Sequence, residues 1–288
     1  MSAILETRGL THIYGAGTPF SHIALDHVDL TVEKGEILGI IGHTGSGKST
    51  LIQHFNGLLQ PTEGEVLLNG QSIWDAKGKC NRETRFRVGL VFQYPEYQLF
   101  EETVAKDIAY GPSNMKLSQK EIDERVRESM RSVGLSEELA EQSPFALSGG
   151  QKRRVAIAGV MAMRPDVLIL DEPTAGLDPA GRDEIFDLIR QYHLQTGATI
   201  LLVSHSMEDI AGLADRLLVM YHSEVLFCDT PRVVFSHAED IIDAGLDVPL
   251  ITKVMLELRR RGLTIDTAVY TVSQALEAIQ TYKARRAR

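Results

Sequence analysis

The chain has 288 residues, of which 43% are hydrophobic and 24% are charged, and these values are ordinary for a globular protein with one large domain or one domain and a small appendage. Its formal net charge of −9 argues against general nucleic-acid binding, which normally needs a basic face. The sequence has no signal-peptide pattern and no apolar run near the roughly 18 residues of a spanning helix, so it predicts a cytosolic protein that reaches a membrane only through a partner.

Strand-like and helix-like segments alternate along the chain, which predicts a layered α/β domain. Residues 3–14 and 22–32 alternate apolar and polar side chains and suit an antiparallel sheet. A helix is predicted after residue 48, with one apolar face formed by Leu51, Phe55, Leu58 and Leu59. A second helix is predicted around 180–195. Short apolar runs predict further strands at residues 35–41, 88–93, 166–172 and 198–205.

Two regions are predicted to be mainly helical. In residues 118–163, Ser118 and Glu121 form a capping-box pattern, and an apolar stripe follows at Ile122, Val126, Met130 and Val133. After Thr230, two amphipathic helices are predicted from Ile251, Val254, Met255 and Leu258 and from Val272, Ala275, Leu276 and Ile279. The final KARRAR could touch anionic lipid, although a solvated terminus is the alternative.

The segment GHTGSGKST, from Gly42 to Thr50, matches the phosphate loop G-x-x-x-x-G-K-[ST] in full. It follows a predicted strand and precedes a predicted helix, as that loop requires. Lys48 is expected to reach the β- and γ-phosphates, and Ser49 to offer its hydroxyl to Mg²⁺. The predicted nucleotide-binding residues are Gly42, Thr44, Gly45, Ser46, Gly47, Lys48, Ser49 and Thr50.

The segment VLILDE places two carboxylates directly after an apolar strand. Beside a phosphate loop, Asp171 suits the Mg²⁺ shell, and Glu172 suits the general base that polarises the attacking water. The alternative is that the pair caps a helix or is surface charge. Together, the two motifs predict nucleotide hydrolysis.

The segment LSGGQ, from Leu147 to Gln151, resembles the signature motif of ATP-binding cassette (ABC) ATPases. Gln93 matches the glutamine loop of that family, Ala175 to Asp178 the loop after the second aspartate motif, and His205 the switch histidine. Tyr14 is placed to stack on adenine, with Phe20 as a rival. The resemblance covers residues 3 to about 230.

The resemblance implies a fold and a division of the chain. The fold is a P-loop NTPase core with a RecA-like α/β subdomain, an antiparallel β subdomain and a helical subdomain. The ABC ATPase domain would span residues 1–230, with its helical subdomain at about 94–165. Residues 231–288 would form a small helical dimerisation domain.

The resemblance also assigns roles to residues, with ATP as the substrate and Mg²⁺ as the cofactor. In this family two cassettes pack head to tail, so that each nucleotide lies between them. The catalytic residues would be Lys48, Gln93, Glu172 and His205, and the metal ligands Ser49, Gln93 and Asp171. The residues that act on the partner's nucleotide would be Ser148, Gly149, Gly150, Gln151 and Asp178.

Residues 92–112, together with THIYGAGTPF near the start, resemble the second ATPase of energy-coupling factor (ECF) transporters. This resemblance implies uptake of vitamins or transition-metal ions, at the cytoplasmic face of the cell membrane. The implied partners are a paralogous ATPase, a transmembrane coupling subunit and small substrate-binding membrane subunits, with no nucleic acid. Glu96, Glu101 and Glu102 are candidates to pair with arginines of the coupling subunit, or else are solvated charge.

Two alternatives remain open from the sequence. One is the ATPase of another ABC importer, for amino acids or metal ions. The other is a soluble cassette protein that acts on nucleic acid or ribosomes. The partner cassette is either a paralogue or a second copy of this chain. A membrane partner would separate these readings, because the phosphate chemistry is common to all of them.

Overall fold

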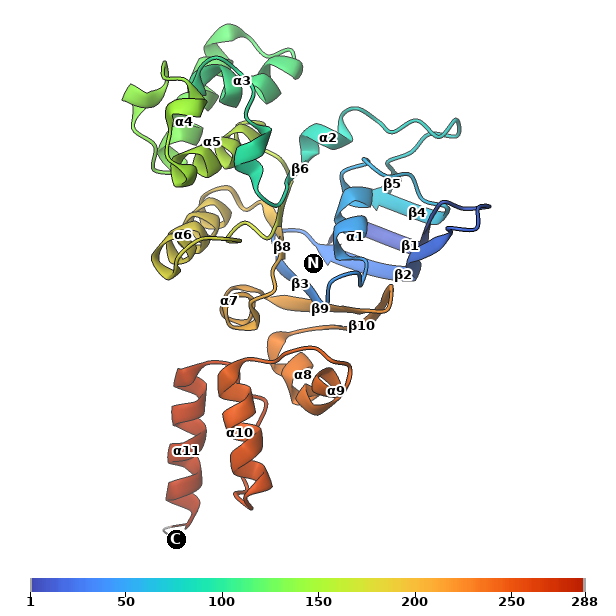
Figure 1. Ribbon diagram of the computed structural model, residues 1–288, viewed down its shortest axis with the longest axis vertical. Helices are drawn as coiled ribbons and strands as arrows, with labels where there is room; N and C mark the ends of the chain where they lie inside the picture. The colour runs from blue at the N-terminus through green and yellow to red at the C-terminus, as the bar shows by residue number, and fades with distance from the viewer. Residues whose placement is uncertain (1, 287–288) are drawn as a thin grey trace.

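The computed structural model describes residues 2–286, and a six-stranded sheet runs through its centre (Figure 1). The strand order is β10-β9-β3-β8-β7-β6, and all neighbours are parallel except β10, which is antiparallel to β9. The strands are β3 (Ile37–Gly42), β6 (Val88–Val91), β7 (Val167–Asp171), β8 (Thr199–Val203), β9 (Arg216–Tyr221) and β10 (Glu224–Asp229). Every residue of β3, β7 and β8 is buried, as expected for parallel strands covered on both faces. The carboxyl ends of these three strands lie at one edge, so the loops that follow them converge there.

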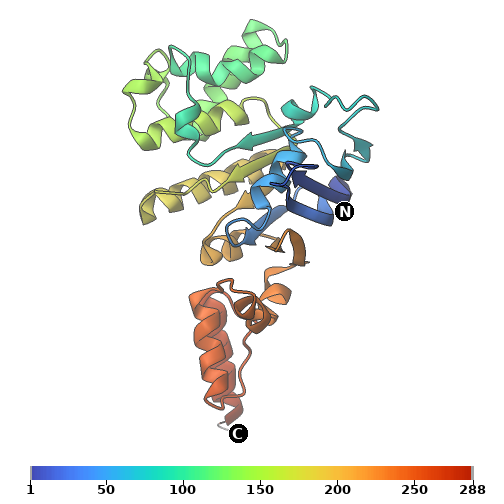
Figure 2. The same cartoon turned by 45° about the vertical axis from the view of Figure 1, so that its right-hand side comes forward.

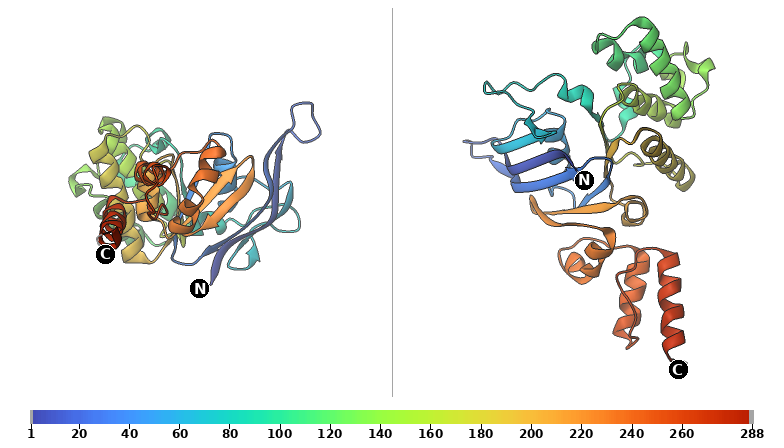
Figure 3. Two further views of the ribbon diagram at one scale, coloured as in Figure 1. Left: turned by 90° about the horizontal axis from the view of Figure 1, so that it is seen from below. Right: turned by 180° about the vertical axis from the view of Figure 1, so that it is seen from behind.

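A second, antiparallel sheet has the strand order β2-β1-β4-β5. Its strands are β1 (Ala3–Tyr14), β2 (His22–Glu33), β4 (Glu63–Leu68) and β5 (Gln71–Ser72). The two antiparallel strands predicted near the start are therefore confirmed. Their hairpin extends well beyond the rest of the sheet in the view from below (Figure 3).

Helix α1 (Lys48–Phe55) packs in the same apolar core as both sheets through Leu51, Ile52 and Phe55, which are fully buried. The prediction that Leu58 and Leu59 continue its apolar face was wrong, because the helix ends at Phe55 and Leu58 is 43% exposed. Gly57 has a φ of 70° just after the cap, and a glycine in this left-handed conformation commonly ends a helix.

The helices between residues 95 and 161 gather at one end of the molecule (Figures 1 and 2). They are α3 (Val104–Asn114), α4 (Gln119–Ser132) and α5 (Gly149–Met161), with the 3-10 helices η1 (Pro95–Gln98), η2 (Glu137–Leu139) and η3 (Pro144–Ala146). The predicted capping box of Ser118 and Glu121 is confirmed at the start of α4, and the predicted stripe is buried. The short helix α2 (Thr84–Arg87) leads into β6.

The C-terminal helices extend from the opposite end (Figures 1 and 2). They are α8 (Pro231–Ser236), α9 (Ala238–Asp243), α10 (Leu250–Arg260) and α11 (Val272–Arg286), and they follow α6 (Pro179–Thr196) and α7 (Met207–Leu213) of the core. The two predicted amphipathic helices are α10 and α11, which share a small core of Met255, Val269 and Ala275. Val272 and Leu276 remain exposed, and a dimerisation role for this region stays a prediction. Ala287 and Arg288 of the basic end lie outside the described residues.

Within residues 2–286, none of the helices is both long enough and apolar enough to cross a membrane.

Candidate nucleotide and catalytic site

The loop from Gly42 to Thr50 joins β3 to α1 and carries Lys48 into the centre of the site. Gly47 has a φ of 100°, and a Cβ there would lie 2.4 Å from the carbonyl oxygen of Ala24, so this position requires glycine. The buried Lys48 donates from Nζ to the carbonyl oxygens of Gly42 at 2.7 Å and His43 at 3.0 Å. Burial lowers the pKa of Lys48, while the charges of Glu172 and Asp171 oppose that effect. The loop therefore holds its cation next to two carboxylates.

The two acidic residues stand where β7 ends. Asp171 accepts a hydrogen bond from Ser49 Oγ at 3.2 Å, and burial raises the pKa of its carboxyl. Glu172 has a φ of 49°, which is uncommon for a residue with a side chain and often marks functional sites. Its carboxylate accepts a hydrogen bond from Gln93 Nε2 at 2.8 Å and lies 2.5 Å from His205 Nε2. Five residues predicted from four separate motifs are thus brought together.

A cleft of about 410 Å³ is lined by Ser49, Gln93, Glu172 and His205 of this group, while Asp171 lies outside its lining. The hydroxyl of Tyr14 lies 3.3 Å from Thr50 Oγ1 at its edge. Phe20, the rival for the adenine contact, is 89% exposed and does not line the cleft. The cleft is lined by Tyr14, His22, Ala24, Thr44, Gly45, Gly47, Lys48, Ser49, Thr50, Gln93, Glu172 and His205. Gly42 and Ser46 belong to the same loop but lie outside this lining.

His22 and Ala24 also line the cleft and were not predicted from the sequence. His22 pairs with Tyr14 across the β1–β2 hairpin, which places both residues at the same edge of the cleft. The signal in the sequence was the pairing of two alternating segments. Their register was needed to align His22 with Tyr14, and it depends on bulges that no pattern gives.

Two histidines pack behind Tyr14 on the side that faces the protein interior. The rings of Tyr14 and His12 meet edge to face with centroids 4.5 Å apart, and His12 meets His54 in the same way at 4.8 Å. His54 is fully buried on α1, and its Nδ1 lies 2.7 Å from the carbonyl oxygen of Thr50. These contacts fix the ring that was predicted to stack on adenine.

We expect the buried His54 to make the protein less stable in acid. Burial lowers the pKa of His54 to about 4, while an unfolded histidine has a pKa near 6.5, so the unfolded chain binds more protons between these values. The stabilisation that depends on neutral His54 is fully present above pH ~6.5, and the free energy of unfolding should fall by about 2–3 kcal/mol as the pH drops to 4. Denaturant unfolding between pH ~6.5 and 4 should show a smaller loss of unfolding free energy for His54→Phe than for the wild type. The exposed His222→Phe is the control, and an equal pH dependence in all three proteins would contradict the assignment.

The residues predicted to act in trans do not line the chain's own cleft. Ser148 caps α5, where its hydroxyl accepts from the N–H of Gln151 at 3.3 Å and the Gln151 side chain accepts from the N–H of Ser148 at 3.0 Å. Gly149 and Gly150 are exposed, and an added Cβ at either would meet nothing within 4 Å. Asp178 caps α6 through Gly181. Because an exposed helix N-terminus is suited to anions, a contact with the partner's nucleotide stays a prediction that this geometry permits.

The three glutamates predicted to contact a membrane partner differ in whether their carboxylates are already paired within the chain. Glu96 is held by both oxygens in an ion pair with the buried Arg153, which leaves it little scope to pair with another subunit. Glu102 is exposed and pairs with Lys106 at 2.5 Å. Glu101 is half-buried, and its side chain makes no ion pair among the described residues. A partner contact therefore remains a prediction for Glu101 and Glu102.

The predicted metal ligands fit Mg²⁺ by chemistry. Ser49 Oγ and Asp171 Oδ2 lie 3.2 Å apart and are both hard oxygen donors, which Mg²⁺ prefers. Gln93 reaches the same edge of the sheet, where its amide contacts Glu172. The three residues converge beside Lys48, and their role as ligands remains a proposal.

Three features together define an ABC-type ATPase. They are a phosphate loop at the end of the central strand β3, two carboxylates at the end of β7, which β8 separates from β3, and an exposed helix start at LSGGQ. The family model described as "ABC transporter" matches residues 25–175. The energy-coupling factor transporter ATP-binding protein EcfA2 of Clostridioides difficile is 56% identical over 281 residues, which are 97% of this chain and 96% of the relative. The EcfA2 protein of Caldanaerobacter subterraneus is 54% identical over 278 residues, 96% of this chain and 97% of the relative.

Solved structures agree with this class. CbiO1 from Clostridium perfringens, described as part of the ABC transporter complex CbiONQ, superposes with a TM-score of 0.74 at 39% identity, covering 91% of this chain and 98% of that one. The dimeric ATP-binding cassette MJ0796, bound to ADP and Pi, gives a TM-score of 0.69 at 28% identity, covering 79% and 98%. The chain belongs to the ABC transporter family, in the branch of the energy-coupling factor transporter ATP-binding proteins. The fold class and the resemblance stated from the sequence are confirmed.

Proposed function

We propose that this chain is the ATP-hydrolysing subunit of an energy-coupling factor transporter that powers uptake of vitamins or transition-metal ions. The observation that carries the proposal is the cleft that gathers Lys48, Gln93, Glu172 and His205 in a chain that aligns with EcfA2 proteins over almost its whole length. The protein would act as a peripheral subunit at the cytoplasmic face of the cell membrane.

The chemistry follows from the contacts in the cleft. Lys48 would exchange its two carbonyl partners for the terminal phosphates of ATP, and Tyr14 would stack on the adenine. Glu172 would leave its contacts with Gln93 and His205 and orient the attacking water, while His205 would contact the γ-phosphate. Ser49, Gln93 and Asp171 would hold Mg²⁺, which when bound neutralises charge on the phosphates.

The outward-facing start of α5 supports a head-to-tail pairing with another cassette. MJ0796 is described as a dimer, which also supports such a pairing here. The partner ATPase would be a paralogue, and the assembly would include a transmembrane coupling subunit with small substrate-binding membrane subunits. Substrate identity would then lie in those small subunits.

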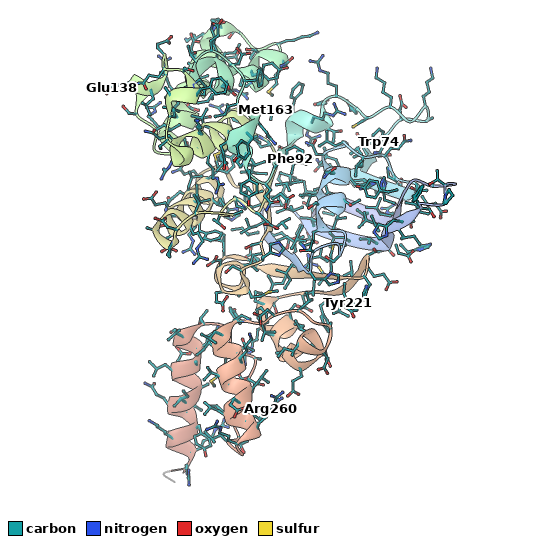
Figure 4. The ribbon with its side chains drawn as sticks, in the orientation of Figure 1. Trp74, Phe92, Glu138, Met163, Tyr221 and Arg260 are labelled. Atoms are coloured by element: carbon teal, nitrogen blue, oxygen red, sulfur yellow. The ribbon has the colours of Figure 1, made fainter. Side chains whose placement is uncertain are left out.

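A groove beside the glutamine loop is a better candidate for the membrane contact than Glu96. It has a volume of about 440 Å³ and lies between α2 and the helices α3 and α5. Phe100 and Tyr110 are about half exposed there and meet edge to face at 4.9 Å, and Arg82, also in the lining, donates to Asn114 Oδ1 at 3.4 Å. Met163, also in its lining, is labelled in Figure 4 near the junction of the helical segment and the core. We propose that a helix of the coupling subunit packs into this groove.

Phe100→Asp should weaken binding of the membrane subunits, because it places a charge among the aromatic side chains of the groove. A central aromatic contact contributes about 2 kcal/mol or more, equal to roughly 30-fold in affinity. Co-purification in detergent measures the loss, and ATP binding by the isolated chain should stay normal. Leu194→Asp is the control, since Leu194 is exposed on α6 outside the groove. Normal assembly of Phe100→Asp would reject the groove as the docking site.

The direct test of the function is transport. The chain would be purified with its associated subunits and placed in liposomes that contain ATP. ATP-dependent accumulation of a vitamin or a transition-metal ion, lost in Lys48→Ala, is expected. A complex that hydrolyses ATP and moves neither class of substrate would refute the proposed cargo but leave the ATPase in place.

A further inference from the structure

Arg153 joins three functional segments from a buried position. It lies on α5, five residues after the cap residue Ser148, and is only 3% exposed. Its Nε and Nη2 donate to the two carboxylate oxygens of Glu96 at 3.1 and 2.9 Å. Its Nη1 donates to the carbonyl oxygens of Pro173 at 3.2 Å and Ala175 at 2.8 Å. The whole guanidinium is therefore committed to two segments outside its own helix, η1 and the loop that follows β7.

Both segments adjoin residues of the proposed catalytic site. Glu96 follows Gln93 by three residues, and Pro173 directly follows Glu172. Gln93 itself donates to Glu172. The contacts therefore form a closed circuit. Arg153 binds Glu96, the backbone connects Glu96 to Gln93, Gln93 binds Glu172, and Pro173, which follows Glu172, accepts from Arg153. Glu172 sits in this circuit with a φ of 49°, a conformation that its surroundings must hold in place.

The chemistry of the contact makes it hard to replace. A bidentate pair between a guanidinium and a carboxylate fixes geometry as well as charge, and a lysine cannot reproduce the fork. Removing one partner of a buried pair leaves an uncompensated charge, so the segments should shift when either partner is changed. The neighbouring Arg154 differs, since it bonds to Val133 and Glu184 and does not touch the Glu172 loop.

We infer that Arg153 is a positioning residue that ties the nucleotide contact made by Ser148 to the placement of Glu172 in the same chain. Movement of α5, when its N-terminus closes on the partner's nucleotide, is carried by the guanidinium to Pro173 and Ala175, and so to Glu172. Glu96, predicted from the sequence to face a membrane partner, serves this internal contact. The inference rests on the proposed function, because it takes Glu172 as the base and Ser148 as a contact in trans.

The test uses the complete complex, purified with its associated subunits, with Arg153→Lys and Glu96→Gln as variants and Arg154→Lys as the matched control. Misplacing a reacting group by about 1 Å typically costs ~10²-fold in rate, so kcat should fall by about that factor in both variants. KM for ATP should stay within about twofold, because neither residue lines the cleft. In a Glu172→Gln background, the variants should still form the closed, ATP-loaded assembly on gel filtration.

The outcomes separate the possible causes. A lower kcat with an unchanged KM and an intact closed assembly supports the positioning role. An unchanged kcat overturns it. Loss of the closed assembly, or a kcat that falls equally in Arg154→Lys, also overturns it, since the arginine would then only stabilise the helix. A wild-type complex without ATPase activity would instead reject the proposed function itself.

Discussion

Glu172→Gln should lower ATP turnover by about 10²–10⁴-fold, the usual contribution of a general base. The substitution keeps the size of the side chain and leaves Lys48 and the phosphate loop untouched, so nucleotide binding should persist. In the proposed mechanism hydrolysis opens the assembly, so the variant should accumulate as a closed, ATP-loaded pair of cassettes.

Single-turnover hydrolysis measures the loss of turnover, and gel filtration measures the ATP that the closed assembly retains. Glu224→Gln is the control, because Glu224 is exposed in the β9–β10 hairpin and does not line the cleft. A turnover number that stays at the wild-type value would contradict the role of Glu172. A loss of ATP binding together with activity would show that the carboxylate holds the site together and does not act as the base.

Ser148→Arg should lower the rate of ATP hydrolysis by the assembled complex at least about 10²-fold, because the arginine blocks the exposed backbone N–H donors at the start of α5. Nucleotide binding by the isolated chain should be unchanged, since Ser148 does not line its own cleft. The change also removes a helix cap, which costs about 1 kcal/mol of stability.

The chain offers a matched control for that cost. Ser118 caps α4 with the same capping-box geometry, far along the chain from the signature motif, so Ser118→Arg loses an equivalent cap without blocking α5. ATPase activity and equilibrium nucleotide binding of both variants separate the two effects. If Ser148→Arg keeps its turnover, or if Ser118→Arg loses as much, the contact in trans is wrong.

The parts of the fold and of the site that follow from local sequence were predictable. The phosphate loop, the two carboxylates after an apolar strand and the capping box of Ser118 and Glu121 each have a short-range physical cause, and each lies where its pattern indicated. The strands β9 and β10 were not predicted, although β9 pairs with β3 at the centre of the sheet. Residues 217–220 and 225–228 are apolar runs of strand length, like those that predicted β3 and β7, so the local signal was present but was not used.

Contacts between distant residues could not be predicted from the sequence. Glu96 and Arg153 are 57 residues apart, and nothing in either segment shows that the carboxylate turns inward. The end of α1 at Phe55 depended on the conformation of Gly57, while the apolar spacing of Leu58 and Leu59 favoured a longer helix. In the first case a long-range contact decided the outcome, and in the second a local helix-ending glycine outweighed the apolar spacing.

The central claim is that this ATPase energises an energy-coupling factor transporter. The most direct measurement is affinity purification of the tagged chain from detergent-solubilised membranes of its own host, followed by mass spectrometry of the proteins that accompany it. We predict one related ATPase, one larger membrane protein and several different small membrane proteins. A pair of permease subunits with a solute-binding protein, or ribosomes or DNA without a membrane protein, would contradict the claim.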